Sequence, residues 1–271
     1  MTLKNKVLKG LEQQPFHLAN PSPWPMYTSL FTFKFLLSIL LFFHNYSYAV
    51  SYIYFSLFFL LYVICNWFYN IVIESTFQGN HTKKVQFGLK MGMILFICSE
   101  IMFFFSFFWC FFHISLAPSI WIGSIWPPAG LKYISFLDIP LLNTVILLSS
   151  GISLTWSHRI FLNKKLIDAF NGLFITILWG LFFTYVQSWE YNSTTFTIND
   201  SVYGSIFFTL TGFHGFHVIL GFSLLIVCLI RLLFKHFTAK QHVGFECSIW
   251  YWHFVDIVWL FLYFIVYCWG C

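Results

Sequence analysis

Seven runs of apolar residues, each as long as a membrane crossing requires, dominate this sequence. A helix needs about 20 apolar residues to span the hydrocarbon core of a bilayer. Such runs, separated by polar breaks, lie at 25–43, 50–73, 86–112, 140–157, 167–189, 202–233 and 246–269. Hydrophobic residues make up 59% of the chain and charged residues 8%, which excludes a soluble domain of 271 residues. The sequence therefore predicts an all-α, polytopic membrane protein with seven transmembrane helices.

The positive charges outside these spans predict how the chain is oriented. Eleven Lys and Arg residues fall in the segments that share one side with the N-terminus, whereas the opposite loops carry Lys132 together with the acids Asp138, Glu190 and Asp200. By the positive-inside rule the N-terminus faces the cytoplasm or the mitochondrial matrix, and an odd number of spans puts the C-terminus on the other side. The eleven are Lys4, Lys6, Lys9, Lys83, Lys84, Arg159, Lys164, Lys165, Arg231, Lys235 and Lys240.

The two ends of the chain carry weaker signals. Residues 1–24 contain lysines but no apolar run before a small-residue cleavage site, so they do not read as a secretory signal, nor as an Arg- and Ser-rich transit peptide. The C-terminal "CWGC" has redox or metal spacing, but it is a single pair. We expect Cys268 and Cys271 to be inert, and a disulfide between them stays open.

A few polar side chains inside the spans are the candidates for function. Glu100 lies in "LFICSEIMFFFSFFW", about fourteen residues or roughly 20 Å past the inner end of the third span, near the midplane. His217 reaches a similar depth in the sixth span, and His214, three residues earlier, shares its face. One hypothesis makes Glu100 a proton-active carboxylate with a histidine neighbour. The other makes it a neutral or hydrogen-bonded acid that fastens the third helix to the sixth.

The remaining intramembrane polar residues favour helix packing over metal binding. His253 and Asp256 stand three apart in the seventh span, and Gly212, Gly215 and Gly221 predict a close helix–helix contact face in the sixth. No carboxylate-rich set and no Cys–His cluster accompanies the histidines, so we expect no metal and no redox centre in this chain. On the basic side, Arg231, Lys235 and His236 form the best candidate for binding anionic lipid headgroups.

Seven long stretches carry a resemblance to a known family. They are "PFHLANPSPWP" at 15–25, "ESTFQGNHT" at 74–82, "GMILFICSEIMFFFSFFWCFFHISLAP" at 92–118, "WPPAGL" at 126–131, "PLLNTVILLSSG" at 140–151, "FTINDSVYGSIFFTLTGFHGFHVILG" at 196–221 and "GFECSIWYWHFVDIVWLFLYFIVYCWG" at 244–270. In this order the chain resembles subunit III of cytochrome c oxidase over nearly its whole length.

The resemblance implies a particular architecture and a supporting role. It implies two first helices, splayed from a five-helix bundle by a lipid-holding cleft. The parts are then a matrix-side segment at 1–24, a two-helix unit with its matrix loop at 25–85 and the bundle at 86–271. The family oxidises cytochrome c, reduces oxygen to water and pumps protons as a complex, and subunit III itself carries no redox centre. It stabilises subunit I, holds phospholipid and is thought to help oxygen to enter and protons to be taken up.

The same resemblance implies cofactors, partners and a location. Haem a, haem a3 and copper belong to partner subunits, and the lipids expected are phosphatidylglycerol, phosphatidylethanolamine and cardiolipin. Subunit I is the main expected contact, followed by subunit II, accessory subunits and respiratory supercomplex partners, with no nucleic acid. The implied location is the mitochondrial inner membrane, with the N-terminus in the matrix and the C-terminus in the intermembrane space.

Individual residues inherit expectations from the family motifs. Glu100 falls on the family's buried carboxylate, which is expected to react with hydrophobic carbodiimides. His81 and Glu74 are left as the polar contributors to a headgroup contact, because the charged run that usually precedes "ESTFQG" is replaced here by a run containing Asn70 and Ile73. The family usually has two histidines after "TW", whereas this sequence has His158 followed by Arg159. His158, together with His253 and Asp256, is expected to be a helix-packing polar residue.

Two rival functions remain. The first is the quinol-oxidase or bacterial version of the same subunit, although the "NPSPWP" stretch and the two early spans favour the cytochrome c enzyme. The second is a proton-coupled transporter that uses Glu100 and the histidine pairs. Such a transporter is expected to show matched Gly or Pro breaks in paired helices, and no matched pair occurs in the sequence.

Overall fold

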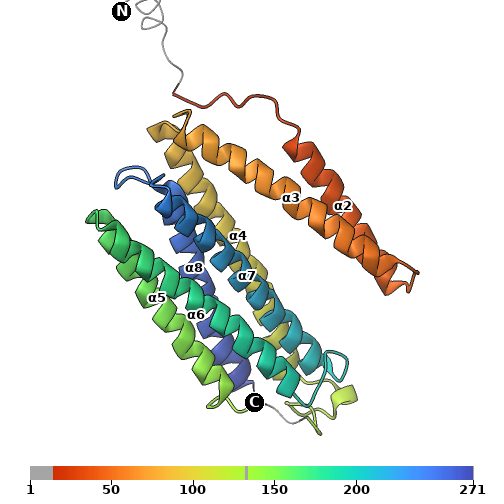
Figure 1. Ribbon diagram of the computed structural model, residues 1–271. Coiled ribbons are helices and arrows are strands. Elements are labelled where there is room, and N and C mark those ends of the chain that lie inside the picture. Colours follow the sequence, from red (N-terminus) through yellow and green to blue (C-terminus); the bar gives the residue numbers. More distant parts are fainter. Residues whose placement is uncertain (1–14, 132–133, 271) are drawn as a thin grey trace, which may run out of the picture. The chain divides into compact units, whose positions relative to one another are not determined.

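The computed structural model describes residues 15–131 and 134–270, and within them the chain is helical with no β-strand. Figure 1 shows the helices in order. They are α2 (Trp24–Phe43), α3 (Ala49–Thr76), α4 (Lys83–Leu116), the 3₁₀ turn η1 (Ile120–Ile122), α5 (Ile139–Leu162), α6 (Leu166–Ser193), α7 (Val202–Leu233), α8 (Val243–Leu262) and the π-helical η2 (Tyr263–Trp269). Among the described residues, seven helices are long and apolar enough to cross a membrane, which confirms the predicted all-α, seven-span fold.

Local sequence explains where several of these helices begin and end. Proline stands in the first turn of both α2 and α5, where its missing N–H costs no helical hydrogen bond. Ser201 caps α7, because its side chain accepts a hydrogen bond of 3.2 Å from the backbone N–H of Gly204. Lys164 and Lys235 have φ angles of 63° and 56°, and these left-handed residues close the C-terminal ends of α5 and α7.

The chain divides into two compact units, residues 1–89 and 90–271, and the division falls within α4. In the first unit α2 and α3 form an antiparallel hairpin. Ser38 and Ser56, both buried, meet across it at 3.2 Å, and Phe31 stacks on Phe59. The sequence places the boundary at residue 85 and predicts a splay with a lipid-holding cleft; these points stay predictions.

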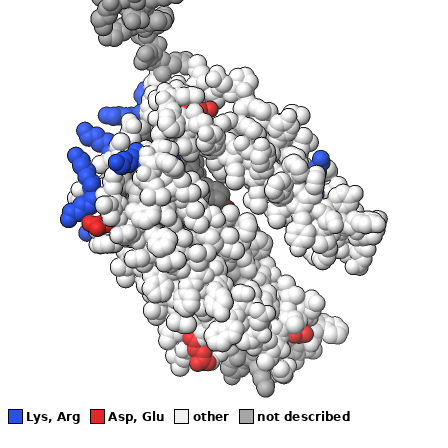
Figure 2. Space-filling model, viewed as in Figure 1, with Lys and Arg blue, Asp and Glu red and all other residues white. Residues whose placement is uncertain are grey.

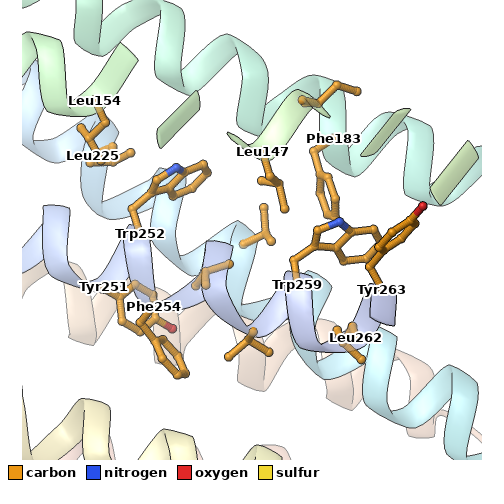
Figure 3. Packing of buried hydrophobic residues seen from close by; sticks show 14 of the residues in the cluster. Leu147, Leu154, Phe183, Leu225, Tyr251, Trp252, Phe254, Trp259, Leu262 and Tyr263 are labelled. Atoms are coloured by element: carbon orange, nitrogen blue, oxygen red, sulfur yellow. The ribbon is translucent and has the colours of Figure 1, made fainter. Parts of the chain in front are cut away.

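The core of the second unit is built by α5 to α8. Each of α5, α6 and α7 packs on the helix that follows it, and α5 also packs on α8. Figure 3 shows Trp252 and Trp259 of α8 among the buried residues of this core. The indole of Trp252 fits against two glycines, since a Cβ atom would stand 2.7 Å from it at Gly180 and 2.9 Å from it at Gly221. Its Nε1 donates to Ser150 at 3.0 Å.

Helix α4 joins this core through long aromatic side chains. Phe103 meets Phe213 of α7 at a ring-centroid distance of 5.0 Å, and Phe108 meets Phe261 of α8 at 6.3 Å. Phenylalanine rings are large enough to separate the backbone of α4 from those of α7 and α8 and still to fill the space between the helices. Between α4 and α8 the filling is incomplete, and a cavity of about 630 Å³ lies there, lined by apolar side chains of both helices and by His253.

Charge is distributed unevenly over the second unit. Figure 2 shows Lys and Arg gathered where the α5–α6 turn and the α7–α8 loop lie, which we call the basic end. The opposite end, here the far end, carries Asp138 and Asp200. The prediction that Glu190 is a loop residue is wrong. The helix α6 continues to Ser193, past the apolar run, and buries the Glu190 side chain completely.

The glycines of α7 differ in what surrounds them. Only Gly221 faces Trp252, whereas a Cβ at Gly212 or Gly215 would meet no atom within 4 Å in the described part of the chain. Across the residues that the structure describes, the predicted contact face of three glycines is therefore reduced to Gly221.

Gly221→Ala is expected to destabilise the second unit by about 1–3 kcal/mol, because its methyl group has to displace the fully buried Trp252 ring. The measurement is the denaturation midpoint of the isolated chain in detergent. Gly215→Ala is the matched control, in the same helix with open space around it, and should be neutral or slightly stabilising. Equal midpoints for the two variants would contradict the described fit of Trp252.

Candidate functional site

Glu100 and His217 form a pair between α4 and α7. The Oε2 atom of Glu100 lies 2.8 Å from Nε2 of His217. The carboxyl side chain is 21% exposed and the imidazole 8% exposed. Phe104 packs against the imidazole edge to face at 5.1 Å. The structure thus brings together the acid and the first of the two histidines that depth matching proposes as its neighbour.

The other ring nitrogen of His217 determines the protonation of this pair. Its Nδ1 lies 2.7 Å from the carbonyl oxygen of Phe213, which can only accept, so Nδ1 carries a hydrogen. A contact of 2.8 Å between Nε2 and a carboxyl oxygen then needs one further proton. It belongs either to a neutral carboxylic acid that donates to His217 or to an imidazolium that donates to Glu100. In both cases the pair is neutral overall, which removes the cost of an isolated charge in hydrocarbon.

His214 does not join this pair. It is 1% exposed, and its ring lies against Phe183 of α6 at 5.7 Å and Trp259 of α8 at 5.2 Å. Neither of its ring nitrogens has a hydrogen-bond partner within the described part of the chain. One helical turn from His217 is therefore enough to place His214 in the aromatic core, away from the carboxylate.

His253 and Asp256 form a second pair, within α8. Nδ1 of His253 lies 3.6 Å from Oδ2 of Asp256, and Asp256 is buried at 7% exposure. The carboxylate approaches α5 closely, because a Cβ atom at Gly151 would stand 2.8 Å from Oδ2. The pair thus lies at the contact of α8 with α5, while the His253 side chain also lines the apolar cavity beside α4.

A chain of polar contacts links three helices at the basic end. Lys90 of α4 forms an ion pair with Glu246, and Oε1 of Glu246 lies 3.4 Å from Nε2 of His242. The same nitrogen is 3.4 Å from Nε2 of His158 in α5. Of these four residues, the sequence indicates only His158 as a helix-packing residue. Lys90 and Glu246 are far apart in the chain, and no local motif links them.

The proposed lipid residues at the basic end have different environments. The Arg231 guanidinium lies over the ring of Phe237 at 4.3 Å. Lys235 is exposed in the left-handed position that ends α7. The backbone N–H of His236 donates to the carbonyl of Arg231 at 2.9 Å, which folds the loop back on the helix. The three residues thus surround the end of α7, with Lys235 reaching outward.

In the first unit, two of the motif stretches meet. Oε2 of Glu74 lies 3.4 Å from Nε2 of His17, and the rings of His17 and His81 are 6.2 Å apart. The Thr82 hydroxyl donates to the carbonyl oxygen of Pro15. The structure therefore adds His17, from "PFHL", to Glu74 and His81 as a third polar side chain at this position.

Within residues 15–131 and 134–270, no group of three or more His, Cys, Asp or Glu side chains is placed to hold a metal ion. Cys271 lies outside the described residues, so the structure does not address a Cys268–Cys271 disulfide. Most of the expected 1–24 segment also lies outside the described residues.

Comparison with known proteins gives one family. The family model for cytochrome c oxidase subunit III matches residues 14–271. "Cytochrome c oxidase subunit 3" of Branchiostoma lanceolatum is 47% identical over 97% of this chain and 100% of its own length. Proteins of the same name from Paracentrotus lividus (50% identical, 95% of this chain and 98% of theirs) and Chondrus crispus (48%, 100% and 99%) are equally similar.

Glu100→Leu and Glu100→Gln are expected to differ in stability. Leucine leaves Nε2 of the buried His217 unpaired and should cost about 1–3 kcal/mol, whereas glutamine keeps a donor facing that nitrogen. Denaturation of the two variants in the same detergent gives the comparison. If leucine and glutamine destabilise the chain equally, the hydrogen bond does not fasten α4 to α7.

Proposed function

This chain belongs to the cytochrome c oxidase subunit III family, and from that premise we propose that it is a core supporting subunit of a mitochondrial cytochrome c oxidase. The whole complex oxidises cytochrome c, reduces oxygen to water and pumps protons. The single observation that carries the proposal is the extent of the match, since residues 14–271 include all seven spans. In this role the chain stabilises subunit I and performs no redox step itself.

The site geometry supports a supporting role over a transport role. Glu100 is paired with His217, and Asp256 with His253, each at the contact of one helix with another. The first pair joins α4 to α7, and the second lies against α5. The Glu100–His217 pair fastens two helices, and the His253–Asp256 pair neutralises charge within one helix, whereas a proton path needs a succession of exchanging groups. This arrangement favours the hypothesis that Glu100 fastens α4.

Partner subunits would supply the redox chemistry. Haem a, haem a3 and copper are assigned to them, with subunit I as the main contact of this chain and subunit II, accessory subunits and supercomplex partners as further ones. The proposed location is the mitochondrial inner membrane. The gathering of Lys and Arg at the basic end supports an N-terminus in the matrix and a C-terminus in the intermembrane space.

Lipid and oxygen handling are the finer parts of the proposal. Arg231, Lys235 and His236 at one place, and Glu74 with His81 at another, are proposed to contact headgroups of phosphatidylglycerol, phosphatidylethanolamine or cardiolipin. The apolar cavity between α4 and α8 supports a passage for oxygen, because a small apolar molecule prefers such a space to water.

Purification of the tagged chain tests the proposal. It should co-isolate with haem a and copper proteins, and Glu100→Gln should leave the haem spectra and most of the turnover of the complex intact, because no redox centre is assigned to this chain. A monodisperse protein without those partners would argue for a carrier. An assembled Glu100→Gln complex with no turnover would refute the supporting role.

Replacing Arg231, Lys235 and His236 together by glutamine is expected to reduce the anionic lipid retained by the purified complex, as measured by native mass spectrometry. The control variant replaces Lys164, Lys165 and Lys240 by glutamine, which removes at least as much positive charge from the same end, because histidine is neutral at pH 7. Equal lipid content in the two triple variants would count against a specific headgroup site.

A further inference from the structure

A second buried carboxyl group, Glu190, lies in a polar cluster that the proposed function does not use. It is 0% exposed near the C-terminal end of α6, and its Oε1 accepts a hydrogen bond of 2.7 Å from the hydroxyl of Tyr267 in η2. Asn143 of α5 donates from Nδ2 to Oε1 of Gln187 at 3.1 Å. The amide of Gln187 also faces the Glu190 carboxyl. We call Asn143, Gln187, Glu190 and Tyr267 the far-end polar cluster.

Three atoms of this cluster are buried and make no well-formed hydrogen bond in the described part of the chain, although Gln187 lies close to the Glu190 carboxyl. They are Oε2 of Glu190, Oδ1 of Asn143 and Nε2 of Gln187. Buried polar atoms in proteins are nearly always hydrogen-bonded, to protein or to ordered water. Gln187 contacts both Asn143 and Glu190, so the three atoms surround one side chain and a single small molecule beside it can serve all of them.

The chemistry of the three atoms selects the ligand. Two are acceptors and one is an amide donor. A cation would suit the two oxygens but would be repelled by the amide hydrogens of Gln187. An anion would suit the amide and would be repelled by the two oxygens. Water donates two hydrogen bonds and accepts others, which matches this set, and buried waters typically make about three hydrogen bonds.

We propose that the far-end polar cluster binds one buried water molecule. The water donates to Glu190 and Asn143 and accepts from Gln187. It thereby joins α5 to α6, and the Tyr267–Glu190 hydrogen bond extends the connection to η2. The cluster has no ionic partner to fill the same role, since none of the ion pairs within residues 15–131 and 134–270 includes Glu190.

A density map of the assembled membrane complex, at a resolution that shows ordered water, tests the proposal. The expected result is one isolated peak about 2.6–3.2 Å from each of the three atoms. A map in which the Asn143 and Gln187 amides are rotated, so that Gln187 pairs directly with a protonated Glu190 and no peak is present, would overturn it. This measurement needs no variant and so does not depend on a mutant folding.

A variant pair adds a second measurement. Gln187→Leu removes the donor and should abolish the peak, and it should shift the unfolding equilibrium by roughly tenfold, as expected when buried polar atoms lose a partner. Ser188→Leu, at the adjacent exposed position of α6, is the matched control and should retain the peak and the stability. A peak that persists unmoved in Gln187→Leu would refute the assigned partners.

Discussion

The inability of hydrocarbon to form hydrogen bonds constrains every polar group of this chain. Within a span, a polar side chain is stabilised by a partner on another helix or on its own helix, and His214 is an exception in the described part of the chain. Glu100 finds His217, Trp252 finds Ser150, and Trp259 donates to Thr144 at 3.0 Å. Each of these contacts joins two helices that are distant in sequence. The hydrogen bonds between polar side chains inside the spans thus indicate which helices are neighbours, and apolar side chains occupy the remaining space between the helices.

Aromatic residues set the spacing between those helices. Where α8 meets α6 and α7, glycines allow the indole of Trp252 to lie against the backbone, and the helices approach closely. Where α4 meets α7 and α8, phenylalanines meet one another ring to ring and keep the helices further apart. The same residue class therefore produces a dense core on one side and an apolar cavity on the other, depending on whether glycine or phenylalanine stands opposite.

The length and polarity of the runs predicted the seven helices well, because membrane thickness imposes both. Equal depth was enough to suggest that Glu100 and His217 are neighbours. Rotation about the helix axis was not predictable, so His214 was offered as an alternative although it faces the aromatic core. Glu190 was assigned to a loop because charge normally ends a span, and its burial depends on Tyr267, which is 77 residues away. Gln187 lies three residues before Glu190, and residues with this spacing share one face of a helix. This spacing is the sequence feature that indicates that the helix continues to Glu190.

The shared proton of Glu100 and His217 has a consequence for how the membrane voltage acts on this pair. Moving a full charge across the bilayer at 100 mV changes the energy by about 2.3 kcal/mol. A proton that passes from Oε2 to Nε2 across a 2.8 Å contact travels about 1 Å of a hydrocarbon core about 30 Å thick, so the same voltage contributes less than about 0.1 kcal/mol. A membrane potential of this size therefore has almost no effect on which of the two atoms holds the proton.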